Sequence, residues 1–124
     1  MLRYVIVVAL LLLPKALAQD SELLDQINAV RKIYEKIPLA LDPKLMRLAK
    51  KEITDKNFCV SNTSLRLVKE KVAKEVAWAC GIKSPKEVFQ YWLDRTEFVL
   101  ATSRRDIRLA GLARSGDNWL LISK

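Results

Sequence analysis

The chain has 124 residues, carries a formal net charge of +8 and contains no histidine. A chain of this length forms one small domain with a thin core, and its 51% of hydrophobic residues excludes a disordered protein. Because the chain has no histidine, it has no imidazole group to transfer protons near neutral pH or to bind zinc. The composition therefore predicts one basic globular domain without the commonest catalytic groups.

The first eighteen residues have the pattern of a secretory signal peptide. Arg3 precedes an apolar run from Tyr4 to Leu13, and Ala16 and Ala18 are small residues placed before a cleavage site. The alternative is a membrane anchor, but about ten apolar residues are too few for a bilayer, which takes about twenty. We predict a signal peptide over residues 1–18 and a secreted, extracellular domain over residues 19–124 that has no transmembrane anchor.

Two amphipathic helices are expected after the signal peptide. Apolar residues recur at helical spacing from Ser21 to Lys36, and Pro38 ends this first helix. The second helix begins after the N-cap residue Asp42, with Pro43 in its first turn, and should end near Asn57. Each helix is expected to pack one apolar face against the core.

The next segment contains a cysteine and a glycosylation motif. Cys59 and Cys80 are the only cysteines, and in an oxidising compartment they favour a disulfide that contributes about 3 kcal/mol. The alternative is a nucleophilic thiol, which needs a base that this chain cannot supply as histidine. Asn62 begins the sequon Asn62-Thr63-Ser64, so it is a candidate glycosylation site in a eukaryotic protein.

The middle of the chain predicts a short helix and a buried strand. Ser64 is placed to cap a helix that carries Leu65, Val68 and Val72 on its apolar face. The apolar run Val76–Cys80 is followed by a glycine, and we interpret it as a buried extended segment that enters a turn. Both elements are expected to contribute to the same core as the first two helices.

The clearest local signal is the helix that follows this turn. Ser84 and Glu87 form a capping box at its start, and the helix should extend to about Asp94. Val88 and Trp92 lie four residues apart, so they stack on one face of the helix. This face predicts a wide buried stripe, with Trp92 as a core residue.

The chain ends with the pattern of a β-hairpin. Two apolar runs, Ile107–Ala113 and Trp119–Ile122, flank a turn that contains Gly116 and Asp117. Helices followed by a terminal hairpin predict an α+β fold in which helices pack on an antiparallel sheet. We find no repeat or linker in the sequence, so a single domain is expected.

Taken in order, six segments resemble the CAP superfamily, also called the SCP domain, in its short bacterial-type form. They are Leu23–Arg31 (family pattern LLxLINxER), Leu39–Leu45 (LxxDxxLxxxA), Val60–Thr63 (FSHT), Ala73–Trp78 (GENIAW), Ser84–Trp92 (SPEEAVxxW) and Leu109–Ala113 (IGVGVA). The resemblance covers nearly the whole mature chain. It implies a single α-β-α sandwich with an antiparallel sheet and a C-terminal hairpin.

The resemblance also implies where a catalytic or metal site would lie. Members with an intact site carry two histidines and two acids that can bind a divalent metal. The corresponding residues here are Asn62, Lys74, Arg95 and Phe98, or Glu75 instead of Lys74 if the alignment shifts by one residue. Two cations repel a divalent ion, and a phenyl ring offers it no ligand. We therefore predict a degenerate tetrad that has no metal, no other cofactor and no catalytic residues.

The leading functional prediction is a non-catalytic protein that acts by binding, because the resemblance implies a lipid, a sterol or a host or cell-surface component as ligand. Nucleic acid is not expected as a partner, since the chain is predicted to be secreted and has no aromatic-rich basic motif. The positions of Trp78, Trp92 and Phe98 discriminate between two versions of this prediction. An open groove would favour an apolar ligand, whereas a filled core would favour an interaction at the surface.

Two alternatives come from other classes. The first is a basic module for anionic glycans or lipid headgroups, because removal of Arg3 and Lys15 with the signal peptide still leaves 20 basic and 14 acidic residues. Its candidate anion-binding residues are Arg104, Arg105 and Arg108, with a second basic cluster at Lys69, Lys71 and Lys74. The second alternative is a hydrolase with an unrecognised carboxylate pair, formed by Glu75 with Glu87 or Asp94.

Overall fold

The computed structural model describes residues 15–95, 98, 104 and 106–124. Most of the signal peptide predicted over residues 1–18 lies outside the described residues, and so does Arg105. The first described helix begins at Lys15, so the cleavage site expected after Ala18 falls within its first turns. None of the helices in the described part of the chain is both long enough and apolar enough to cross a membrane.

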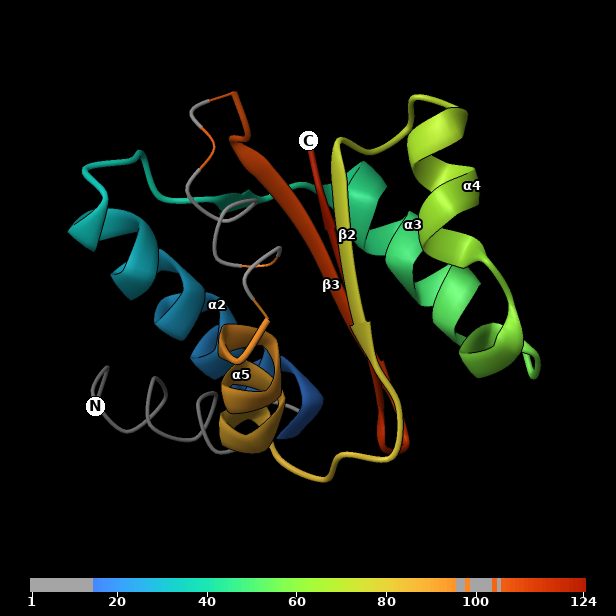
Figure 1. The fold of residues 1–124 in the computed structure, drawn as a ribbon. Coiled ribbons are helices and arrows are strands. Elements are labelled where there is room, and N and C mark those ends of the chain that lie inside the picture. The colour runs from blue at the N-terminus through green and yellow to red at the C-terminus, as the bar shows by residue number, and fades with distance from the viewer. Residues whose placement is uncertain (1–14, 96–97, 99–103, 105) are drawn as a thin grey trace, which may run out of the picture.

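Helices cover both faces of a four-stranded sheet, as Figure 1 shows. The helices are α2 (Lys15–Ile33), α3 (Pro43–Ile53), α4 (Thr63–Lys69) and α5 (Pro85–Leu93), with a short 3₁₀ helix η1 (Phe58–Val60). The strands are β1 (Ala40–Leu41), β2 (Glu75–Ala79), β3 (Leu109–Ser115) and β4 (Asn118–Ser123), in the spatial order β1-β3-β4-β2. Helices α2 and α5 lie on one side of the sheet and α3 and α4 on the other. The predicted α+β class and sandwich are confirmed.

The sheet is mixed, which corrects the prediction of a wholly antiparallel sheet. Strands β3 and β4 form the predicted hairpin, with Ala110 opposite Ser123, and β2 pairs antiparallel with β4. The two-residue strand β1, however, pairs parallel with β3, with Ala40 opposite Leu109. A strand of two residues has too little pattern to be recognised in sequence, so its direction could not be predicted.

Two hydrophobic clusters hold the layers together. The cluster under α2 and α5 includes Leu23, Ile27, Trp92 and Trp119, and the cluster under α3 and α4 includes Leu67. Complete burial of an aliphatic or aromatic side chain contributes about 1.5–3 kcal/mol, so these two clusters are the main stabilising feature of the fold.

The predicted starts of α3 and α5 agree with the structure, whereas the first helix begins at Lys15 rather than at Ser21 and ends at Ile33. The side chain of Asp42 accepts a hydrogen bond of 3.0 Å from the backbone N–H of Leu45, and Ser84 accepts one of 3.2 Å from Glu87. Helix α5 ends with Asp94 as its C-cap residue. A capping side chain that accepts a hydrogen bond from an N–H group at the helix N-terminus contributes about 1 kcal/mol. Because this contribution is local, a capping residue in the sequence predicts where a helix begins.

The predicted disulfide is present. Cys59 in η1 and Cys80, the residue after β2, are joined by a bond of 2.04 Å. The bond connects the loop before α4 to the end of an edge strand. It therefore holds the α3 and α4 layer onto the sheet, beside the contact between Phe58 and Trp78.

Two predictions for the middle of the chain were wrong in detail. Helix α4 begins at Thr63, so Ser64 lies inside it, and its buried apolar residue is Leu67 rather than Leu65 or Val68. The segment from Val76 is a strand as predicted, but β2 is at the sheet edge and Trp78 is 42% exposed. In both cases tertiary packing decides which apolar side chains are covered.

Candidate functional site

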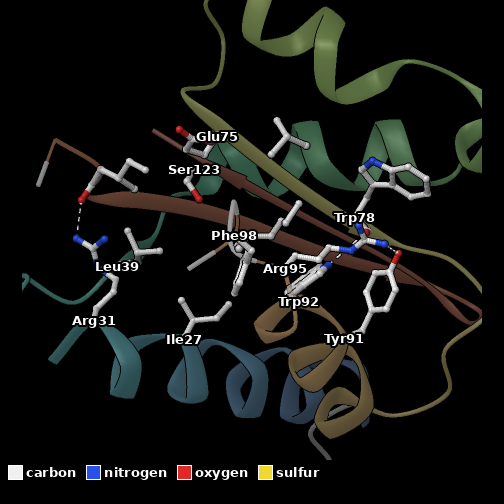
Figure 2. A pocket seen from close by; sticks show the side chains of 14 residues that line it. Ile27, Arg31, Leu39, Glu75, Trp78, Tyr91, Trp92, Arg95, Phe98 and Ser123 are labelled. Carbon is white, nitrogen blue, oxygen red and sulfur yellow. Dashed lines mark hydrogen bonds between the residues drawn. The ribbon is translucent and has the colours of Figure 1, made fainter. Parts of the chain in front are cut away.

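A pocket of about 310 Å³ lies between the sheet and the helices α2 and α5, and Figure 2 shows it from close by. Nine apolar residues line it, from α2, β2, α5, β4 and the connecting segments, and they are Ile27, Leu39, Val76, Ala77, Trp78, Trp92, Phe98, Ile107 and Leu121. Polar side chains lie among these and at the rim, namely Arg31, Glu75, Tyr91, Arg95 and Ser123. An apolar wall with a few polar groups is the usual composition of a small-molecule pocket.

Two aromatic side chains form one wall of the pocket. Trp92 is 1% exposed, and its ring packs on that of Phe98 with 5.2 Å between ring centroids and an interplanar angle of 34°. The indole nitrogen of Trp92 also donates a hydrogen bond of 3.2 Å to the carbonyl oxygen of Trp78. The predicted core position of Trp92 is therefore correct, and the same ring faces the pocket.

The ring of Trp78 has a different environment. It packs edge to face on Phe58, with 6.4 Å between the ring centroids and an interplanar angle of 78°. Phe58 belongs to the hydrophobic cluster under α3 and α4. The question of groove or filled core thus has a divided answer. All three residues line the pocket, but Trp92 and Phe98 also belong to the buried core, and the ring of Trp78 packs on the other layer.

Arg31 is the one polar residue of the pocket wall that is completely buried among those described. Its guanidinium donates hydrogen bonds to the carbonyl oxygens of Ile37 at 2.8 Å, Ile107 at 2.9 Å and Arg104 at 3.2 Å. Burial lowers the pKa of Arg31, but an arginine stays charged at neutral pH. The side chain therefore joins α2 to two loops and places a positive charge in the pocket wall.

An ion-pair network lies at the rim beside β2. Arg104 contacts Glu75 at 2.6 Å and Asp106 at 3.0 Å, and the Nζ of Lys74 lies 3.4 Å from Asp106. The hydrogen bonds from Arg104 lower the pKa of the Asp106 carboxyl, and those to Asp106 and Glu75 raise the pKa of Arg104. The charge of Glu75, the acidic residue of the pocket, is therefore balanced by Arg104.

The opposite end of the pocket is marked by a cation over an aromatic ring. The guanidinium of Arg95 lies 4.5 Å from the centre of the Tyr91 ring and also donates a hydrogen bond to its hydroxyl. Both residues come from the C-terminal half of α5 and the turn that follows it. Figure 2 shows them together at the side of the pocket that faces Trp78.

The four positions of the degenerate tetrad do not converge. Arg95 and Phe98 line the pocket, whereas Lys74 lies at the rim in its contact with Asp106. Asn62 lines a separate hollow of about 270 Å³ at the start of α4. In the part of the chain that the structure describes, no three side chains of histidine, cysteine, aspartate or glutamate come together as metal ligands would.

The other candidate residues are also separated. Glu75 lines the pocket, but Glu87 lies in the first turn of α5 and Asp94 accepts a hydrogen bond of 3.1 Å from Gln90. The carboxylate pairs proposed for a hydrolase are therefore not assembled in this pocket. Among the candidate anion-binding residues, Arg104 is engaged in ion pairs and Arg108 is exposed. Asn62 is exposed, as a glycosylation site must be.

Arg31 is a pocket residue that the sequence prediction did not single out. A signal was present, because Leu23, Ile27 and Arg31 follow one another at intervals of four residues on the buried side of α2. A charged residue that continues a buried stripe needs hydrogen-bond partners inside the protein. The carbonyl groups that serve this purpose come from distant parts of the chain.

Among the comparisons with known proteins, the solved structures support the fold. No protein-family model matches the sequence, and no curated protein matches it. A cysteine-rich secretory protein from Staphylococcus aureus subsp. aureus Mu50 has a similar structure, with a TM-score of 0.71 and 16% identity, over 90% of this chain and 39% of that chain. An extracellular protein containing an SCP domain from Bacillus anthracis str. Ames gives a TM-score of 0.68 and 13% identity, over 87% and 40% of the two chains.

These findings establish the class of fold. The three-layer α+β arrangement is that of the SCP, or CAP, domain, as the order of motifs implied. The chain spans about two fifths of the length of both proteins, since it covers 39% and 40% of them. The likeness therefore concerns one domain, and the activity of this chain has to be argued from its own residues.

Proposed function

We propose that this protein is a secreted, non-catalytic binding protein that holds a small lipid-like molecule in the pocket between the sheet and the helices α2 and α5. The observation that carries the proposal is the cavity of about 310 Å³, whose lining includes nine apolar residues. Ligand pockets in proteins span about 300–1,000 Å³ and are mostly apolar. A volume near the lower limit suits a single acyl chain better than a bulky ring system.

The charges of the pocket favour an anionic head on this ligand. Arg31 lies in the pocket wall and Arg95 at the opposite end, whereas Glu75 is balanced by Arg104. Charge-assisted hydrogen bonds to a carboxylate or a phosphate are about twice as strong as neutral ones, and arginine is suited to both groups. A fatty acid combines an acyl chain with such a head.

The absence of catalysis is part of the same proposal. The chain has no histidine, and Glu87 and Asp94 do not line the pocket together with Glu75. Acid–base catalysis needs a proton donor and acceptor within reach of the bound substrate, so this arrangement supports a binding role. Secretion is supported by the pattern of residues 1–18 and by an extracellular protein among those of similar fold.

Titration with dodecanoate, followed through tryptophan fluorescence, tests the proposal. Ala77 is a half-buried pocket residue of β2, and Ala77→Phe would fill the cavity with its ring. The matched control is Leu65→Phe, because Leu65 is exposed on the other side of the sheet. We expect saturable binding that Ala77→Phe weakens at least about tenfold and Leu65→Phe leaves unchanged.

A second titration with dodecanol examines the head group. Dodecanol has the same chain but no charge, so it should bind more weakly than dodecanoate by about tenfold, the loss expected for one charge-assisted hydrogen bond. The proposed function is wrong if neither compound binds saturably, or if Ala77→Phe binds dodecanoate as well as the unchanged protein does.

A further inference from the structure

The outer surfaces of α3 and α4 form one continuous side of the molecule. On α3 the buried residues Leu45, Ala49 and Ile53 face the sheet, so the residues half a turn away face solvent. On α4 Leu67 faces the sheet in the same way. Figure 1 shows both helices on the side of the sheet opposite α2 and α5. A salt bridge of 2.5 Å between Glu52 of α3 and Arg66 of α4 joins them.

This surface holds most of the excess positive charge of the protein. Residues 43–71 contain eight basic and three acidic residues, an excess of five, while the whole chain has +8. Arg66 is paired with Glu52 and Glu70. Seven exposed basic residues make no salt bridge with any described residue, and they are Lys44, Arg47, Lys50, Lys51, Lys56, Lys69 and Lys71.

The same segment of the chain carries exposed apolar side chains. Val60 is 85% exposed, Leu65 66% and Val68 42%, and all three belong to η1 and α4. On α4, Leu65 and Lys69 lie on the side that points away from Leu67, and Val68 lies next to them toward one edge of the helix. We call these three apolar and seven basic residues the α3–α4 face.

We propose that the α3–α4 face docks on a membrane surface that contains anionic lipids. The seven basic side chains complement the negative headgroups, and each contributes attraction within a Debye length of the membrane. Leu65 and Val68 enter the boundary between headgroups and acyl chains, which receives apolar side chains that project from a basic surface. A soluble anionic glycan would use the charges but would leave these apolar side chains in water.

The α3–α4 face is distinct from the ligand pocket, because the two lie on opposite sides of the sheet. Failure of one proposal therefore leaves the other intact. Asn62 lies at the start of α4, beside this face, and a glycan there would interfere with docking. All proteins in the test carry Asn62→Gln, which is a mild change because the Asn62 side chain makes no cap hydrogen bond.

Sedimentation with phosphatidylcholine vesicles, with and without phosphatidylserine, tests the charges. The face variant is Arg47→Gln with Lys51→Gln and Lys69→Gln. Its matched control removes the same charge with Lys32→Gln, Lys83→Gln and Lys86→Gln. These three exposed lysines lie in α2, in the loop before α5 and in α5. Each basic residue near the membrane changes partitioning onto the vesicles about fivefold. The partitioning of the face variant should therefore fall about hundredfold, and that of the control much less. Equal losses in the two variants would overturn the proposal.

A second pair of variants separates a membrane from an anionic glycan. Leu65→Ser with Val68→Ser should weaken binding to the phosphatidylserine vesicles about tenfold and leave retention on heparin unchanged. The control is Ile33→Ser with Ile37→Ser, two exposed isoleucines outside the face, which should leave both measurements unchanged. If the Leu65 and Val68 changes leave vesicle binding as it was, the face binds polyanions through charge alone and the membrane proposal is wrong.

Discussion

The indole nitrogen of Trp92 donates its hydrogen bond to the carbonyl oxygen of Trp78, 14 residues earlier in the chain. The bond joins α5 to β2, which is an edge strand of the sheet. It also fixes the orientation of the Trp92 ring, which packs on Phe98 and lines the pocket. One side chain thus stabilises the fold and shapes the proposed binding site.

We predict that Trp92→Phe lowers the free energy of unfolding by about 1–3 kcal/mol, because it removes a buried hydrogen bond and part of a packed ring. Urea unfolding measures this change. Trp78→Phe is the control, since the ring of Trp78 is 42% exposed and its carbonyl remains in place. The control should lose less than about 1 kcal/mol. Equal losses for the two variants would contradict the assignment of Trp92 as the anchor.

Arg31 should be intolerant of lysine. Lysine keeps the charge, but its single nitrogen cannot reproduce the forked contacts with the carbonyls of Ile37, Arg104 and Ile107. Because the unmatched buried carbonyls cost about 1–3 kcal/mol each, we expect Arg31→Lys to lose about 2–4 kcal/mol of stability.

The control for Arg31 is Lys32→Arg, a change of the same two residue types at an exposed neighbouring position of α2. It should leave the stability within about 0.5 kcal/mol of the unchanged protein. Thermal unfolding of both variants at neutral pH measures these two changes in stability. Unchanged stability in Arg31→Lys would mean that the three carbonyl contacts are dispensable.

Local features of the fold were predictable because their physics is local. Ser84 and Glu87 lie three residues apart, as the capping box requires, and Asp42 caps α3 in the same way. The hairpin needed only two apolar runs around Gly116, which has a φ of +60°. The sequence order of such signals also carried the resemblance that led to the correct fold.

Features that depend on distant contacts were not predictable. The guanidinium of Arg31 donates a hydrogen bond to the carbonyl oxygen of Ile107, which lies 76 residues later in the chain. No local sequence pattern predicts that partner. The exposure of Trp78 follows from the place of β2 at the sheet edge, which is decided by strand order. The pocket also depends on distant contacts, since its wall comes from α2, β2, α5, β4 and segments that connect such elements.

Gly111 should be the least replaceable glycine among those described. A Cβ atom at this position would lie 2.2 Å from the backbone oxygen of Leu45, so α3 would have to move away from β3. We expect Gly111→Ala to cost about 3 kcal/mol or more, as overpacking of a rigid contact does. Gly116→Ala is the comparison, because a Cβ there meets no atom within 4 Å and only the positive φ is unfavourable.

The comparison variant should lose about 1 kcal/mol, the cost of placing alanine in the left-handed region. Urea unfolding of both variants measures the two losses. A smaller loss for Gly111→Ala than for Gly116→Ala would show that α3 is not held against β3 as closely as the structure indicates.

The carboxyl of Asp106 should titrate below its ordinary range. The hydrogen bonds from Arg104 are the largest cause of its lowered pKa, and Lys74 adds a smaller attraction. Because the folded-state pKa lies below the unfolded one, the charged carboxylate stabilises the fold above the unfolded pKa of about 3.9. This contribution is lost as the pH falls through the lowered folded-state pKa.

Carbon-13 NMR of the Asp106 carboxyl measures the pKa directly. We expect Arg104→Gln to raise the pKa of Asp106 toward its ordinary value and Lys74→Gln to raise it less, because Arg104 makes two of the contacts, at 3.1 and 3.0 Å. Added salt should reduce the shift in the unchanged protein, since both partners are exposed. A larger rise in Lys74→Gln than in Arg104→Gln would reverse this order and remove Arg104 from the centre of the rim network.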